Sequence, residues 1–280
     1  MATKLAIGGY GPVTVTAGRL VIAAIFLAAA TYFKGPGLPR FRTKEGRTVW
    51  LYCIVLGLFT NAVPFSLLNW AQLRVTSGFA GVTMAAVPLL VLPMAHWLVP
   101  GEQMSLKKII GFVIGFIGVF VLIGPETFLQ PTGDKLEPLA RLACLGAAVC
   151  YASGTILIRI SPAKCMISLC AGGLLVGSLV MIPMALYYEG VPDVRFDQPL
   201  LAMIYLGVLP TAVTTLLLIQ IINSAGPSFM SMVNYHVPIW AIAFGIVLLN
   251  EALPPSFVGA LALILTSLAI VQHSQRRKYK

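Results

Sequence analysis

Charged residues are scarce in this sequence. They make up 10% of the 280 residues, and only 9 are acidic, whereas hydrophobic residues make up 58%. Soluble domains carry about 25% charged residues, and a soluble protein of this length could not keep so much apolar side chain away from water. A disordered chain is excluded for the same reason. The remaining class is an integral membrane protein that crosses the bilayer many times.

The sequence also lacks the patterns that hold metals, nucleotides or nucleic acids. Its 5 cysteines form no CxxC pair and its 3 histidines are far apart, so we interpret the cysteines as buried free thiols and expect no metal and no other cofactor. No P-loop is present. The basic residues lie between apolar runs rather than on one soluble face, which argues against a nucleic-acid partner.

Long apolar runs dominate what is present. A helix needs about 20 mostly apolar residues to span a bilayer, and a helix satisfies its own backbone hydrogen bonds in lipid. Each run is therefore predicted to be a spanning helix. The predicted spans are residues 12–33, 48–71, 75–98, 106–124, 139–160, 165–188, 199–223, 227–250 and 256–272.

Basic residues alternate between the loops. Lys and Arg are frequent after the first, third and fifth predicted spans and in the C-terminal tail, whereas acidic residues gather in the other connections. Cytoplasmic loops carry the excess of Lys and Arg, so we expect a cytoplasmic C-terminus. Nine full spans would then place the N-terminus outside, which is unusual without a cleavable signal.

An internal repeat explains this oddity. The residues that match at an offset of 150, with a small gap for the last pair, include Gly57 and Gly207, Ala62 and Ala212, Pro88 and Pro238, and Glu102 and Glu251. These matches predict two homologous halves, residues 1–124 and residues 139–280. The first half has four full spans and the second has five, so we expect the first half to lack most of its first helix, of which residues 1–10 would be the remainder.

Five spans per half insert the second half with the opposite polarity to the first. The predicted fold is therefore an all-α integral membrane protein with a ten-span inverted repeat of five helices, of which nine are full spans in this sequence. Secondary transporters use this architecture, with the substrate site near the middle of the membrane.

Short motifs in both halves carry a family resemblance. They are residues 61–71 (NAVPFSLLNWA), 76–80, 87–88, 101–102 and 111–115, followed by residues 231–238, 250–251 and 259. On these motifs the sequence resembles the ten-helix permeases of the EamA type in the drug/metabolite transporter superfamily, over nearly the whole chain. The resemblance implies a multi-pass protein of the bacterial inner membrane that exports amino acids or other small metabolites without a soluble cofactor.

Polar and aromatic residues inside the spans are the candidate substrate-binding residues, because polar groups in lipid are costly. The candidates are Arg19, Asn61, Asn69, Trp70, Gln72, Tyr151, Gln220, Tyr235, His236 and Trp240. Arg19 is suited to draw in an anionic group such as a carboxylate. The alternatives are an Arg19 side chain that extends to the membrane surface, hydrogen bonds between helices for the amides and plain packing for the aromatic residues.

Three other patterns predict structure rather than transport. The threonines at 211, 214 and 215 are expected to bond to their own helix. Gly111, Gly115 and Gly118 match the spacing of small residues in close helix packing. Glu102 is expected to cap the following helix, with an ion pair to Lys107 or Lys108 as the alternative.

No Asp or Glu lies inside a predicted span, and His236 is the main candidate for titration within the membrane. Proton-driven transporters commonly carry carboxylates there, which favours uncoupled or weakly coupled export. We expect a transporter that works by alternating access through a central cavity, not an enzyme, with a monomer as the simplest assembly and a dimer as the alternative. The competing readings are a membrane enzyme, a channel, or a transporter of drugs, nucleosides or sugars.

Overall fold

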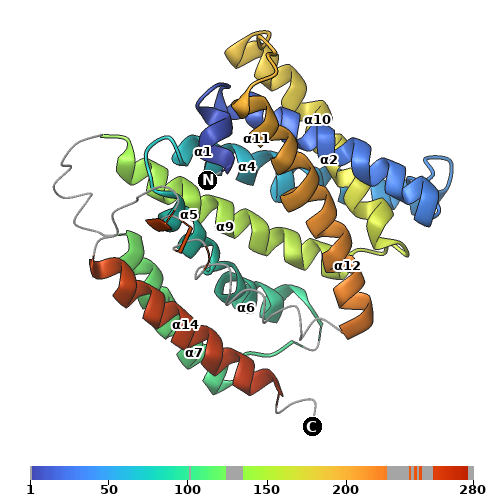
Figure 1. Ribbon diagram of the computed structural model, residues 1–280. Helices are drawn as coiled ribbons and strands as arrows, with labels where there is room; N and C mark the ends of the chain where they lie inside the picture. The colour runs from blue at the N-terminus through green and yellow to red at the C-terminus, as the bar shows by residue number, and fades with distance from the viewer. Residues whose placement is uncertain are drawn as a thin grey trace. The chain divides into compact units, whose positions relative to one another are not determined.

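The computed structural model describes residues 2–100, 102–123, 135–225, 240, 243–244, 246–247 and 255–276. Throughout these residues the regular structure is helical (Figure 1). The chain divides into two compact units, and each unit takes segments from both sequence halves. Unit 1 draws on residues 74–156 and 231–280, and unit 2 on residues 2–73 and 157–230.

Within the described ranges, six helical segments are long and apolar enough to cross a membrane. They are Pro12–Phe33, Lys44–Ala71, Ser77–Leu98, Glu137–Ile160, Met166–Glu189 and Gln198–Gln220. A shorter apolar helix covers Phe257–Val271. The chain is therefore an all-α multi-pass membrane protein, as its composition predicts. Most of the predicted span 227–250 lies outside the described residues.

Unit 2 is built from seven helices and two π-helical turns. They are α1 (Ala2–Ile7), α2 (Pro12–Lys34), α3 (Lys44–Leu56), η1 (Gly57–Ala62), α4 (Val63–Ala71), α10 (Met166–Glu189), α11 (Gln198–Gly207), η2 (Val208–Val213) and α12 (Thr214–Ala225). Helix α10 packs along α2 and α3, and α11 packs on α1 and α2. Pro12 begins α2, as predicted, because the first residue of a helix needs no N–H donor.

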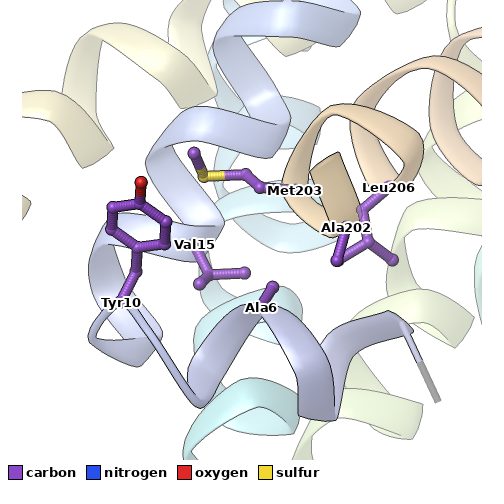
Figure 2. Packing of buried hydrophobic residues seen from close by; sticks show 6 residues of the cluster. All are labelled: Ala6, Tyr10, Val15, Ala202, Met203 and Leu206. Carbon is purple, nitrogen blue, oxygen red and sulfur yellow. The ribbon is translucent and has the colours of Figure 1, made fainter. Parts of the chain in front are cut away.

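The short helix α1 is held by apolar contacts with α2 and α11. The buried residues of this cluster, shown in Figure 2, are Ala6, Tyr10, Val15, Ala202, Met203 and Leu206. Gly18 leaves the space that the Met203 thioether fills, because a Cβ at residue 18 would overlap the sulfur. The apolar residues before the first predicted span are thus part of the core of unit 2.

Two repeat-related glycines allow close approach of helices in unit 2. A Cβ on Gly57 would lie 2.5 Å from the carbonyl oxygen of Gly173 in α10. A Cβ on Gly207 would lie 2.7 Å from Cβ of Ile22 in α2. Both distances are too short for a real side chain, so the matched glycines occupy matched packing positions, η1 on α10 and the start of η2 on α2.

Unit 1 contains α5 (Ser77–Met84), α6 (Val87–Leu98), α7 (Leu106–Ile123), most of α9 (Glu137–Ile160) and α14 (Pro255–Arg276). The span predicted over residues 75–98 is interrupted between α5 and α6 by a turn at Ala85 and Ala86. Pro88 explains the interruption, because its nitrogen cannot donate to the carbonyl of Met84 four residues earlier.

Helices α7 and α14 lie side by side along their length in unit 1 (Figure 1). Gly111, Gly115 and Gly118 face α14, and the Ser267 hydroxyl donates to the carbonyl oxygen of Gly111. A Cβ on Gly118 would lie 2.9 Å from Cγ1 of Ile264. The close packing predicted from the glycine spacing is confirmed.

We predict that Gly111→Leu destabilises the protein by about 1–3 kcal/mol, because overpacking forces neighbouring side chains and backbone to move. A Cβ at residue 111 already lies 2.6 Å from Cγ2 of Val271. Thermal unfolding of the full chain in detergent measures the loss. Gly259→Leu is the matched control, because Gly259 is exposed on α14 with open space around its Cβ position. Equal losses for both variants would contradict the packing account.

Candidate functional site

Arg19 lies within α2 and contacts two other elements of unit 2. Its Nε donates to Oγ1 of Thr211 in η2 at 2.7 Å. Its guanidinium carbon lies 3.8 Å from the centre of the Phe65 ring in α4, a distance typical of a cation–π contact. The Arg19 side chain is half-buried and Thr211 is 5% exposed. The cation is thus held between α4 and η2.

The turns η1 and η2 have the same local construction in the two sequence halves. In each, a backbone N–H reaches back five residues instead of four: Val63 donates to Leu58, and Thr214 donates to Leu209. Such π-helical turns are rare and occur frequently at functional sites. They lie in the two segments that the 150-residue offset aligns.

Side chains at matched positions stabilise both turns. Asn61 Nδ2 donates to the carbonyl oxygen of Leu56 at 3.4 Å, and Thr211 Oγ1 donates to that of Leu206 at 2.8 Å. The two donors and the two acceptors are each 150 positions apart. Thr214 and Thr215 also bond to carbonyls of their own segment. The threonines therefore do what the sequence predicts of them.

The π-helical turns themselves were not predicted. A proline near each turn was the sequence feature that could have indicated it. Pro210 has no N–H for the carbonyl of Leu206, and Pro64 has none for that of Thr60. Thr211 then supplies the donor that Leu206 would otherwise lack. A proline next to a threonine or asparagine in an apolar span is therefore a clue to such a turn.

Asn69 connects α4 to the first turn of α2. Its Nδ2 donates to the carbonyl oxygen of Pro12 at 3.2 Å and to Oγ1 of Thr16 at 2.9 Å, and the residue is 2% exposed. This is the hydrogen bonding between helices that the sequence left open as the alternative to substrate binding. Trp70 and Gln72 are half-buried beside it, and Gln220 is exposed on α12.

Glu189, at the end of α10, binds the start of α2. Its two carboxylate oxygens accept from the backbone N–H groups of Val13 at 3.0 Å and Thr14 at 2.8 Å. The first N–H groups of a helix have no partner within it and attract negative charge. Sequence reasoning placed Glu189 in an acidic loop and missed this contact, because the partners are far apart in the chain.

Two further candidates, Tyr151 and Trp240, belong to unit 1. Tyr151 is half-buried in α9, and Trp240 is 55% exposed and stacks on Phe244 with ring centres 5.4 Å apart. Tyr235 and His236 lie outside the described residues.

Glu102 has the ion-pair partner that the sequence offered as an alternative to capping. Lys108 Nζ lies 3.5 Å from Oε2 of Glu102 and donates to the carbonyl oxygen of Gln103 at 3.3 Å. Lys108 is only 6% exposed. His96 Nδ1 lies 3.2 Å from the carbonyl oxygen of Glu102, so the start of α7 carries a compact polar cluster. Glu251, which matches Glu102 in the second half of the sequence, lies outside the described residues.

The structure also shows the state of the cysteines and the placement of possible metal ligands in the described part of the chain. All 5 cysteines lie in it and none is bridged. No three His, Cys, Asp or Glu side chains come together there as metal ligands would.

We predict that Asn69→Ala lowers the free energy of unfolding by about 1–3 kcal/mol, because the buried contact between α4 and α2 is lost. Thermal unfolding in detergent measures the change. Thr155→Ala is the control: its hydroxyl bonds only to its own helix and the residue is exposed, so a change within about 0.5 kcal/mol is expected. An unchanged Tm for Asn69→Ala would show that the contact contributes nothing.

Known proteins resemble the chain over almost its full length. The model of the EamA-like transporter family matches residues 1–124 and 139–272. The uncharacterized transporter YvbV of Bacillus subtilis (strain 168) is 24% identical over 265 residues, which cover 94% of this chain and 83% of that protein. Protein PecM of Dickeya dadantii (strain 3937) is 26% identical over 240 residues, covering 82% and 78%.

Two further comparisons bear on cargo and fold. An S-adenosylmethionine/S-adenosylhomocysteine transporter of Chlamydia trachomatis serovar L2 is 22% identical, covering 99% of this chain and 85% of that protein. A crystal structure with 22% sequence identity superposes with a TM-score of 0.69, covering 98% of this chain and 92% of that chain, and shows the same fold. With a family match over both parts of the sequence and an all-α multi-pass architecture, the chain belongs to the EamA-like transporter family and is a membrane transporter.

Proposed function

We propose that this transporter exports small metabolites that carry an amino-acid head group, and that Arg19 binds their carboxylate. The contact of Arg19 with Thr211 and Phe65 carries the proposal. A cation within a membrane span is expensive, and such residues commonly mark a substrate pathway. A guanidinium matches the geometry of a carboxylate, which it can bind through two parallel hydrogen bonds.

The relatives support an amino-acid head group rather than a free amino acid alone. Relatives from Chlamydia are named for S-adenosylmethionine and S-adenosylhomocysteine. Both molecules join an adenosine to an amino acid through sulfur. Amino acids and these compounds therefore share an ammonium and a carboxylate on one carbon, and we assign the carboxylate to Arg19.

The other candidate residues complete the proposed site. Polar contacts come from Asn61, Asn69, Gln72 and Gln220, and stacking comes from aromatic side chains. The proposed aromatic and titratable residues are Trp70, Tyr151, Tyr235, His236 and Trp240. In this proposal they line a central cavity between the two sequence halves, 1–124 and 139–280, which opens to one side of the membrane at a time.

The proposed setting is the bacterial inner membrane, with the C-terminus in the cytoplasm. Alternating basic loops support this orientation, because Lys and Arg gather on the cytoplasmic side. A monomer is the simplest assembly, since two internal repeats can enclose a pathway without a second subunit.

We predict that proteoliposomes containing the full chain take up amino acids or S-adenosylmethionine saturably. Arg19→Gln should reduce the uptake about tenfold or more, because a hydrogen bond to a charged group contributes about 1.5–3 kcal/mol. Arg195→Gln is the matched control, since Arg195 is exposed in a loop of the same unit and pairs with Asp193. Uptake of radiolabelled solutes measures both variants.

Other outcomes of this assay identify the alternatives. Uptake of uncharged sugars or nucleosides alone, unaffected by Arg19→Gln, would assign a different cargo. Conversion of the solute to a product would indicate an enzyme. A flux of ions that does not saturate would indicate a channel.

We also predict that transport does not depend on a proton gradient. No Asp or Glu lies within a predicted span, so an imposed pH difference of one unit should change the initial rate by less than about twofold. Stopped-flow or filter assays with and without an ionophore measure the rate. Accumulation that is driven by protons and abolished in His236→Ala would refute the uncoupled mechanism.

A further inference from the structure

The two π-helical turns of unit 2 differ in charge although their construction is the same. The position that matches Arg19 at the 150-residue offset is Leu169 in α10. Leu169 is fully buried among Trp50, Cys53 and Leu56. The Arg19 cation of α2 therefore contacts η2. At the matched position in α10, the aliphatic Leu169 packs on α3, the helix that ends where η1 begins. The pseudo-symmetry of the unit is broken at this residue.

The Thr211 hydroxyl connects Arg19 to the backbone at η2 through two hydrogen bonds. A hydroxyl has one hydrogen to donate and two lone pairs to accept with. Its hydrogen goes to the carbonyl oxygen of Leu206 at 2.8 Å, and a lone pair accepts from Arg19 Nε at 2.7 Å. Donation from a cation polarises the hydroxyl and strengthens the bond that it donates in turn.

The carbonyl at the end of this chain of hydrogen bonds is the one that Pro210 leaves without an α-helical donor. Leu206, Pro210 and Thr211 thus form one local arrangement. Its hydroxyl, that of Thr211, accepts a hydrogen bond from Arg19. The carbonyl oxygen of Arg19 is also in contact with this region, at 3.1 Å from the position of a Cβ on Gly207. The backbone of α2 is therefore closely packed on the start of η2 at the level of Arg19.

Phe65 fixes the other side of the guanidinium. The ring lies 3.8 Å from the guanidinium carbon and belongs to α4, directly after η1. A cation on an aromatic face is restrained in position while its edge stays available for hydrogen bonds. The Arg19 side chain therefore connects η2 with the helix that follows η1.

From these contacts we propose that Arg19 is a positioning residue that holds η2 in its π-helical form through Thr211, and that cargo binding at Arg19 is thereby coupled to the shape of η2. A carboxylate that binds the guanidinium changes how strongly Nε donates to Thr211. By linkage, the conformation of η2 then changes the affinity for the carboxylate by the same factor. This inference rests on the proposed cargo contact but concerns a different property, the stability of one turn without cargo.

Hydrogen–deuterium exchange of the full chain in lipid nanodiscs, without added solute, tests the proposal. Arg19→Met and Thr211→Val remove the donor and the hydroxyl and should each accelerate exchange of the amides in residues 208–216 by about tenfold or more. The double variant should be no faster than the faster single variant, because both remove the same interaction. Exchange in α3 should not change. Arg19→Gln keeps a donor where the arginine Nε lies, and Thr211→Ser keeps the hydroxyl, so both should retain at least part of the protection.

The matched control is Thr214→Val. Thr214 is exposed and donates to the carbonyl of Leu209 in the same turn, at 2.9 Å, whereas Arg19 Nε donates to Thr211. Its substitution should accelerate exchange by less than about threefold.

Three results would overturn the proposal. One is unchanged exchange of residues 208–216 in Arg19→Met, which would leave Arg19 as a cargo contact only. Another is equal acceleration in Thr211→Val and Thr214→Val, and the third is acceleration spread evenly over all helices. None of these depends on whether any solute is transported, so the failure of this inference is distinguishable from failure of the proposed function.

Discussion

Backbone groups within the hydrocarbon of a membrane have no water to bond with, and this constraint organises unit 2. Each carbonyl that a proline or a π-helical turn removes from the α-helical ladder must find a donor inside the protein. Thr211 supplies one for Leu206, and Asn61 supplies one for Leu56. At the start of α2, the carboxylate of Glu189 accepts from two N–H groups. At these three places a side chain thus completes the hydrogen bonds of the backbone.

Close helix packing is the second consequence of the same environment. Apolar side chains gain little from leaving lipid for protein, so helices associate where small residues let backbones approach. Gly57 and Gly207 do this at matched places in unit 2, and Gly111 does it between α7 and α14 in unit 1. Glycine at such contacts is a requirement of space, which Gly259, with open space around its Cβ position, does not share.

Two basic residues of the apolar helices, Lys108 and Arg19, have defined partners. Lys108 is paired with Glu102, and Arg19 rests on Phe65 and Thr211. These two basic residues differ in what they contact. Lys108 lies beside a carboxylate, whereas the Arg19 guanidinium contacts the Thr211 hydroxyl and the Phe65 ring. We assign Arg19 to the anionic group of the cargo because a cation within an apolar span commonly marks a substrate pathway.

The membrane class and the apolar helices follow from the sequence, because hydropathy is a property of short segments, and the matched positions of Gly, Pro and Glu predict two related halves. The turn between α5 and α6 and the two π-helical turns needed the structure, since proline permits several local solutions and packing selects one. The partners of Arg19, Asn69 and Glu189 also came only from the tertiary structure. Each contact joins residues more than 50 positions apart, and no local pattern encodes which distant helix a polar side chain will meet.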